Sequence, residues 1–161
     1  MKGGIIEVRP VIMGRHDLCL RPYPNHKNGC PNYATKEGCP PGVPMFDAFY
    51  DLSKSVYAVY NVFNLKGHVD RMKERHPDWS KRQLECCLYW QGTARKSLRE
   101  RIEIFEKLTG NEKYVISVVP EAMGVNVTET MKRVGIELEW PPVNVVYQIA
   151  MAGVTREDPW R

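Results

Sequence analysis

The sequence has no long apolar run and no familiar catalytic motif. No stretch approaches the ~18 to 20 apolar residues that a membrane span requires. The opening MKGGIIEVRPVIMGRHD is interrupted by Glu7 and Arg9, and no cleavage-like site follows it, so it predicts a strand and not a signal peptide. The G-x-S-x-G, H-E-x-x-H, phosphate-loop and Rossmann glycine patterns are also missing. We therefore expect a cytoplasmic protein without a membrane role.

The composition is that of an ordinary globular chain. Of the 161 residues, 43% are apolar and 26% are charged, which predicts one compact domain spanning residues 1–161. The net charge of +4 permits a small or nucleotide-like anionic substrate without requiring one. The aromatic residues lie inside apolar patterns and a basic tail is absent, so nucleic acid is an unlikely partner except as a substrate. Nothing in the sequence predicts the oligomeric state.

Local patterns predict alternating strands and helices. Apolar, β-branched runs predict strands at 5–12, 56–65, 113–120, 136–140 and 143–152. A long amphipathic helix is expected over 80–109, with a Ser80–Gln83 capping box at its start and Gly110 as its C-terminal cap. The predicted fold class is α/β or α+β, with a small mixed sheet and helices packed on it.

The five cysteines are an odd number in a chain without a predicted secretory signal. This argues against a disulfide framework and for a reducing compartment. Three of them, Cys19, Cys30 and Cys39, fall in a segment rich in proline and glycine, 14–45, which predicts a long loop with little core for a thiol to pack into. A bound metal is therefore favoured. The spacing matches neither a zinc ribbon nor a bacterial ferredoxin; it fits a [4Fe–4S] cluster somewhat better than tetrahedral zinc, which stays the alternative.

A fourth ligand could come from Cys86 or Cys87 in the predicted long helix. At 100° per residue, Cys87 is expected on the apolar face with Leu84 and Leu88, whereas Cys86 points away from that face. Either cysteine could instead be ordinary core packing. His26 is a reserve ligand, although a lone loop histidine is more often solvated or hydrogen-bonded.

The cysteine segment resembles a known family. The stretch CLRPYPNHKNGCPNYATKEGCPPGVP, from Cys19 to Pro44, followed by DAFYDLSKSVYAVYNVF, is similar to a predicted metal-binding, cysteine-rich family of unknown function from archaea and anaerobic bacteria. Nearer the C-terminus, VTETMKRVGIELEW resembles another element of that family. The family pattern has a second, later cysteine group, whereas here the only later cysteines are the adjacent Cys86 and Cys87. The resemblance implies iron–sulfur or other metal binding and supplies no reaction.

Polar residues between the loop cysteines are candidates for chemistry at the metal. His26 or Tyr23 could donate a proton, and Arg21 could pair with an anionic substrate. Asn25 and Asn32 could contact the substrate, although asparagine in such turns often has a purely conformational role.

A second candidate group lies in the predicted helix. Glycine inside a helix costs ~1 kcal/mol relative to alanine, so Gly92 suggests the close approach of another element, such as the cysteine loop. Gln91, Arg95 and Lys96 would then lie near the site and could hold a phosphate or a carboxylate. A solvated helix face is an equal alternative for Arg95 and Lys96.

These patterns support two functional hypotheses. The first is a cytoplasmic iron–sulfur enzyme, a lyase, desulfidase or sulfur transferase, in which one iron lacks a protein thiolate and can bind a substrate atom. The second is a structural or interaction module that zinc or a fully ligated cluster holds together without catalysis.

Overall fold

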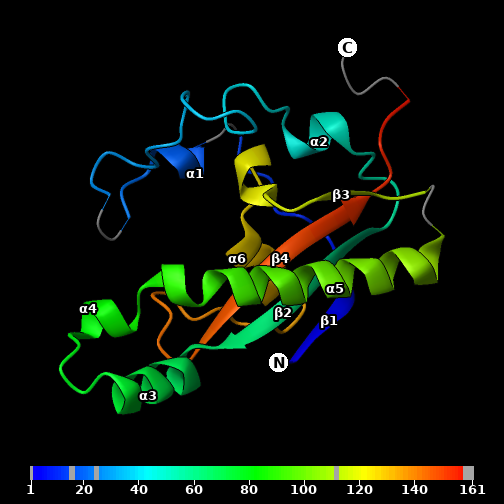
Figure 1. Cartoon of the computed structure of the whole chain (residues 1–161). Helices are drawn as coiled ribbons and strands as arrows, with labels where there is room; N and C mark the ends of the chain where they lie inside the picture. The colour runs from blue at the N-terminus through cyan, green and yellow to red at the C-terminus, as the bar shows by residue number, and fades with distance from the viewer. Residues whose placement is uncertain (1, 15–16, 24–25, 111–112, 158–161) are drawn as a thin grey trace.

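Figure 1 shows the computed structural model of the chain, which describes residues 2–14, 17–23, 26–110 and 113–157. The strands are β1 (Lys2–Val8), β2 (Val56–Asn64), β3 (Val115–Ser117) and β4 (Val145–Gly153). The helices are α1 (Asp17–Leu20), α2 (Phe46–Phe49), α3 (Leu65–Arg75), α4 (Lys81–Leu84), α5 (Gln91–Thr109) and α6 (Val127–Lys132), with the short 3₁₀ helices η1 (Cys87–Tyr89) and η2 (Pro120–Met123). Within these described ranges, none of the helices is both long enough and apolar enough to cross a membrane.

The strands of the described chain form one sheet in the order β1-β2-β4-β3. Each neighbouring pair runs antiparallel, and Val59 lies opposite Ala150 in the central β2–β4 pair. This confirms a single-domain α+β fold. The sheet is antiparallel where a mixed one was predicted, because the described helices do not serve as crossovers between parallel neighbours. The predicted strand at 136–140 is not part of the sheet.

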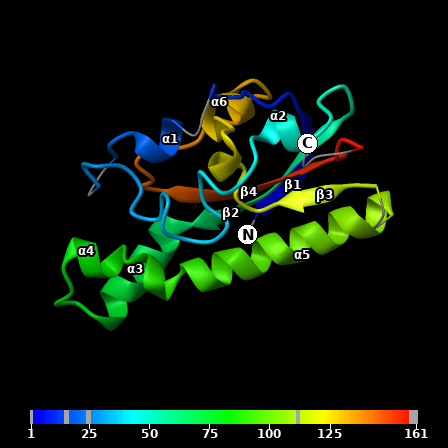
Figure 2. The ribbon, with the colours of Figure 1, turned by 90° about the horizontal axis from the view of Figure 1, so that it is seen from above.

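The sheet separates two hydrophobic layers, as Figure 2 shows from above. On one face α2, η2 and α6 pack over a core that includes Phe46, Met131 and Met151. On the other face Phe105 of α5 packs against Val59 of β2 and Ala152 of β4. Because successive side chains of a strand point to opposite faces, a central strand covered on both sides needs consecutive apolar residues. This explains why the β2 sequence VYAVYNVFN carries no charge.

The predicted helix 80–109 is interrupted, which corrects the expectation of one continuous helix. Its start and end are confirmed: Ser80 and Gln83 form the capping box, and Gly110 is the C-terminal cap with a φ of 73°. Between them the chain leaves helical geometry at Cys86, whose φ and ψ are −58° and 120°. The Trp90 indole explains the detour, because its ring stacks on Phe63 at 5.0 Å and its Nε1 donates to the Glu85 carbonyl at 3.2 Å.

The break also reverses the predicted orientation of neighbouring side chains. Leu88, which was expected on the apolar face with Leu84, is 85% exposed, while Leu84 is buried. Cys87 is exposed and Cys86 is half-buried, so the expectation that Cys87 faces the core is wrong.

The start of the cysteine loop is tied to η2 and α6. The Met13 amide donates to the Gly124 carbonyl at 2.8 Å, and the Asn126 amide donates to the Val11 carbonyl at 2.7 Å. The buried Thr130 hydroxyl accepts a bond from the Val11 amide at 2.9 Å. These bonds bring α1 against η2, on the face of the sheet opposite α5 (Figure 2).

Candidate functional site

The backbone of the loop brings Cys30 directly against Cys19. The Cys30 amide donates to the Cys19 carbonyl at 2.7 Å. Gly29 makes this approach possible: its φ is 83°, and an added Cβ would lie 2.6 Å from the Cys19 carbonyl oxygen. A residue with a side chain is strained at this φ and would collide with the Cys19 turn. The glycine therefore fixes the distance between the first two cysteines.

Cys39 returns to the same region through a series of turns. The Cys39 amide donates to the Lys36 carbonyl at 3.1 Å, and the Ala34 amide donates to the Pro40 carbonyl at 2.7 Å. The pKa of Cys19 shows which groups lie near it. Burial raises the pKa of the Cys19 thiol, and the neighbouring Cys30, Cys39 and Glu121 raise it further. The three loop cysteines and the Glu121 carboxyl thus share one neighbourhood.

This neighbourhood is not a preformed ligand shell. Among the described residues, no group of three or more His, Cys, Asp or Glu side chains lies close enough to hold a metal ion. Cys30 and Cys39 are near enough to raise the pKa of Cys19, and all three cysteines are half-buried. Metal binding would require them to draw closer together than they lie here.

Tyr23 and His26 pair beside the cysteines. Their backbones exchange two hydrogen bonds, of 3.1 and 2.8 Å, and their rings lie 4.5 Å apart. Burial, the charge of Cys30 and a hydrogen bond with the Cys30 side chain raise the pKa of the Tyr23 hydroxyl. The two predicted proton donors are therefore together, and one of them is bonded to a candidate ligand.

The other loop candidates make fewer contacts with the cysteines. Arg21 and Asn32 are exposed. The Asn32 carbonyl accepts bonds from the amides of Thr35, at 3.2 Å, and Lys36, at 3.1 Å, which fits a turn-forming role. Asn25 lies outside the described residues.

The helix candidates lie elsewhere. Cys86 and Cys87 occupy the junction between α4 and α5, which Figure 1 shows well apart from the cysteine loop. Gln91, Arg95 and Lys96 follow in the first turns of α5, on the opposite face of the sheet from the loop. An added Cβ at Gly92 would meet nothing within 4 Å, so the predicted close approach of another element there is wrong.

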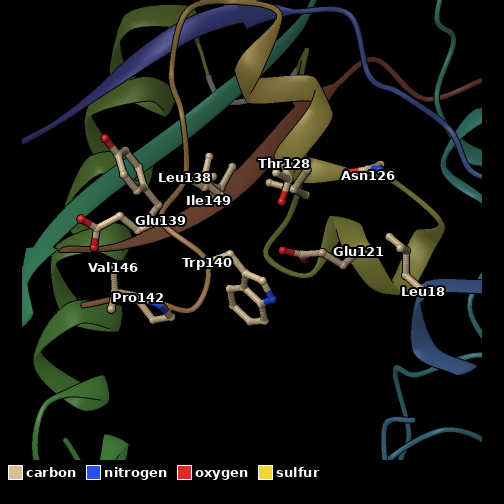
Figure 3. A pocket seen from close by; sticks show the side chains of 12 residues that line it. Leu18, Glu121, Asn126, Thr128, Leu138, Glu139, Trp140, Pro142, Val146 and Ile149 are labelled. Carbon is tan, nitrogen blue, oxygen red and sulfur yellow. The ribbon is translucent and has the colours of Figure 1, made fainter. Parts of the chain in front are cut away.

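A pocket of about 280 Å³ opens next to the cysteines, between α1, η2, α6, the start of β4 and the segment 138–142 (Figure 3). Its wall is largely apolar, with a few polar groups. The lining residues are Leu18, Glu121, Asn126, Val127, Thr128, Leu138, Glu139, Trp140, Pro142, Val146, Tyr147 and Ile149. Leu18 precedes Cys19 in α1, so the pocket borders the cysteine neighbourhood directly.

Glu121 connects the pocket to the cysteines. Figure 3 shows its carboxyl pointing from η2 into the pocket, toward the side where Trp140 lies. The residue keeps solvent-exposed surface, yet the protein around the carboxyl removes part of its hydration and raises its pKa. The same carboxyl is among the groups that raise the pKa of Cys19.

Glu139 builds the opposite wall. Its carboxylate accepts bonds from the amides of Val143 at 3.0 Å, Asn144 at 2.7 Å and Val145 at 3.2 Å, and from Asn144 Nδ2 at 2.6 Å. The Asn144 side chain, followed by these amides, lowers the pKa of Glu139 to about 2. The turn that results presents Trp140, which is 71% exposed, at the pocket.

Sequence reasoning missed the pocket residues Glu121, Glu139 and Trp140. Trp140 carried a usable signal, since an aromatic residue directly before Pro141 and Pro142 indicates a rigid turn that displays a ring. Glu121 carried none, because Cys19 lies far from it in the sequence and meets it only through the contact of α1 with η2.

Comparisons with known proteins leave the site to be interpreted on its own chemistry. A scan against protein-family models, a search of curated proteins and a search of solved structures found no match to this chain. The resemblance of the Cys19–Pro44 segment to a cysteine-rich metal-binding family stays an expectation. The function is therefore argued from the cysteine neighbourhood and the pocket beside it.

Proposed function

We propose that Cys19, Cys30 and Cys39 hold an iron–sulfur cluster of the [4Fe–4S] type, and that the adjacent pocket receives a small-molecule substrate. The observation that carries the proposal is that Cys30, Cys39 and the distant Glu121 are all near enough to raise the pKa of Cys19, at the edge of that pocket. The protein would then be an iron–sulfur enzyme of the lyase, desulfidase or sulfur-transferase kind.

Packing alone does not account for the gathering of these thiols. The four residues of α1 include no fully buried side chain, and most side chains between Cys19 and Cys39 are exposed. Burial, Cys30 and Cys39 raise the pKa of the Cys19 thiol, which disfavours its thiolate in the absence of a cation. A bound metal reverses that balance, because it favours the deprotonated ligands and its binding energy stabilises the loop.

The choice between a cluster and zinc depends on the fourth ligand. In the described part of the chain, a fourth thiol does not accompany the three, because Cys86 and Cys87 lie at the junction between α4 and α5. Three thiolates suit a cluster with one iron free of protein sulfur, whereas a structural zinc site is closed by four protein ligands. A pocket beside the thiols favours the first arrangement. Zinc would require Glu121 or His26 as an additional ligand.

The chain's own residues suit proton transfer next to such a centre. A metal position without a protein ligand would act as a Lewis acid or bind sulfur when the group is present. Tyr23, hydrogen-bonded to the Cys30 side chain, can donate a proton there, and the His26 ring lies 4.5 Å from the Tyr23 ring. Glu121 faces the pocket from the other side and can accept or return a proton.

The proposal is tested by anaerobic purification and by measuring iron, acid-labile sulfide and zinc together with a visible spectrum. We expect roughly four irons and four sulfides per chain with a broad charge-transfer band. Cys19→Ser, Cys30→Ser and Cys39→Ser should each lose most of the iron. Cys86→Ser and Cys87→Ser, the matched controls, should retain it.

Two results would overturn the proposal. One zinc per chain without iron would replace the enzyme with the metal-stapled structural module. Protein that holds neither metal after anaerobic purification and reconstitution would remove the metal centre altogether.

A further inference from the structure

The pocket at Glu121 and Glu139 has a charge pattern that selects its ligand. Both carboxyls line it, and among the described residues that form the wall there is neither Lys nor Arg. The ion pairs of the described chain, Lys66–Asp70 and Lys81–Glu85, include neither glutamate. The pocket is thus acidic although the chain as a whole carries a net charge of +4.

The acidity is fixed by the fold. Glu139 cannot swing away to meet a distant cation, because four donors hold its two oxygens in the turn before β4. Its charge therefore stays at the pocket wall. Figure 3 shows the Glu121 carboxyl pointing from η2 toward Trp140, whereas the Glu139 carboxylate points away from both, on the other side of the 138–142 segment. A ligand beside Trp140 would therefore meet the Glu121 carboxyl directly.

The remaining wall suits a flat, apolar body. Trp140 lines the pocket and is 71% exposed, and apolar side chains such as Val146 and Ile149 are also part of the lining. An indole face attracts a cation that lies over it, and indole is the strongest of the aromatic side chains in this respect. Asn126 and Thr128 add polar contacts at the rim beside α6.

We propose that this pocket binds a small organic amine in its protonated form, with a flat or aromatic body against Trp140 and the ammonium group at the Glu121 carboxyl. A volume of about 280 Å³ lies just below the lower end of the usual range for small-molecule sites, roughly 300 to 1,000 Å³, so the ligand is small. The claim that the amine is the substrate of the metal centre rests on the proposed function. The claim that the pocket binds the amine depends on the pocket residues alone.

The substrate expected from the sequence was anionic, and the pocket does not support that choice. Of the residues predicted to bind an anion, Arg95 and Lys96 lie across the sheet on α5, and Arg21 is not part of the wall. A carboxylate ligand beside Trp140 would meet the Glu121 carboxyl and find no basic partner in the described lining.

A pair of matched probes tests the proposal: 2-phenylethylamine and 3-phenylpropionate have similar size and opposite charge. Titration of the purified protein, followed by calorimetry and by chemical-shift changes, should show at least about tenfold tighter binding of the amine, as close charge complementarity and a cation–π contact imply. Glu121→Gln and Trp140→Ala should each weaken amine binding several-fold. Glu103→Gln and Tyr89→Ala, exposed residues outside the pocket, should leave it unchanged.

Because Trp140 is mostly exposed, its replacement should leave the fold intact, and the comparison of the two probes on the native protein needs no variant at all. Equal or stronger binding of 3-phenylpropionate would overturn the assignment, and so would amine binding that Glu121→Gln and Trp140→Ala leave unchanged. Metal analysis of the same samples separates the two proposals. Amine binding by protein without metal would support the pocket assignment and contradict the metal centre. Bound metal without amine binding would support the metal centre and contradict the pocket assignment.

Discussion

At the residue scale, the Glu139 carboxylate holds a turn in the pocket wall, and its contribution to stability should depend on pH. Its folded pKa of about 2 lies below the ordinary value of 4.5. The group therefore stabilises the fold fully above pH 4.5, and this contribution is lost as the pH falls toward 2. We expect Glu139→Gln to lower stability at neutral pH and to reduce the loss of stability between about pH 4.5 and 2, as measured by urea denaturation at a series of pH values.

The control for this prediction is Glu103→Gln on the exposed side of α5. Asp51, whose pKa is also lowered by its bonds to Ser53, remains in both proteins, so the difference between the profiles isolates Glu139. Identical profiles for the native protein and Glu139→Gln would show that the four hydrogen bonds do not hold the carboxylate in solution.

Single residues also show how much of the site could be predicted from the sequence. The grouping of Cys19, Cys30 and Cys39 in one segment poor in regular structure could be predicted from its proline and glycine residues, but the short helix α1, which carries Cys19, was not predicted. The place of Glu121 could not, since it depends on a contact between α1 and η2 that is not encoded in any local pattern. Local signals place residues within a segment, whereas the site is made where two segments meet.

At the scale of elements, Gly92 and Gly135 form a natural pair of test positions. An added Cβ would meet nothing within 4 Å at either position, but Gly135 has a φ of 81° and Gly92 lies in the first turn of α5. We expect Gly92→Ala to raise the free energy of unfolding by roughly 0.5 to 1 kcal/mol, because alanine favours the helix. Gly135→Ala should lower it by roughly 1 to 2 kcal/mol, because a side chain is strained at that φ.

Chemical denaturation of the native protein and the two variants, fitted with one common m-value, measures both changes in the free energy of unfolding. Destabilisation by Gly92→Ala would reveal an approaching element, as the sequence suggested, and would contradict the open surroundings found here. A neutral Gly135→Ala would indicate that the turn after α6 can relax to a negative φ.

Helix boundaries were predicted better than helix continuity. The Ser80–Gln83 capping box and the Gly110 cap are local signals, and the structure contains both. The break between them arises because Trp90 stacks on Phe63 of β2, a tertiary contact that outweighs the local preference of 85–90 for helix. The same reason makes Leu88 exposed although its spacing fits an apolar helix face.

At the scale of the whole molecule, the sheet separates the face that α5 covers from the face that carries the candidate site. The uncharged sequence of β2 is typical of a strand covered on both sides, and α5 and α6 pack on opposite faces of the sheet. The strand order could not be predicted, because the pairing of β2 with both β1 and β4 depends on contacts distant in sequence. Figure 2 shows α1 and α6 on the face of the sheet that α5 leaves free, and residues of α1, η2 and α6 line the pocket.

This division predicts where a metal would stabilise the protein. The amides of Cys30, Ala34 and Cys39 are bonded only within the loop, whereas β2 and β4 pair along most of their length over two apolar cores. Removing the metal should therefore speed hydrogen exchange at the three loop amides by roughly a hundredfold, the effect of a ligand present at about 100 times its dissociation constant. Exchange at the amides of the β2–β4 pair should change little, because the cores there do not depend on the loop.

Hydrogen exchange followed by mass spectrometry, on metal-loaded and chelator-treated protein, measures both regions at once. The metal-loaded Cys87→Ser protein serves as the control, and it should match the native protein in the loop. If the β2–β4 amides lose protection together with the loop, metal binding stabilises the entire domain, and the protein behaves as a metal-stapled module in which binding energy is folding energy. If the loop amides exchange at the same rate in both samples, Cys19, Cys30 and Cys39 do not hold the metal, because a ligand bound there would have to suppress the opening of the turns that carry them.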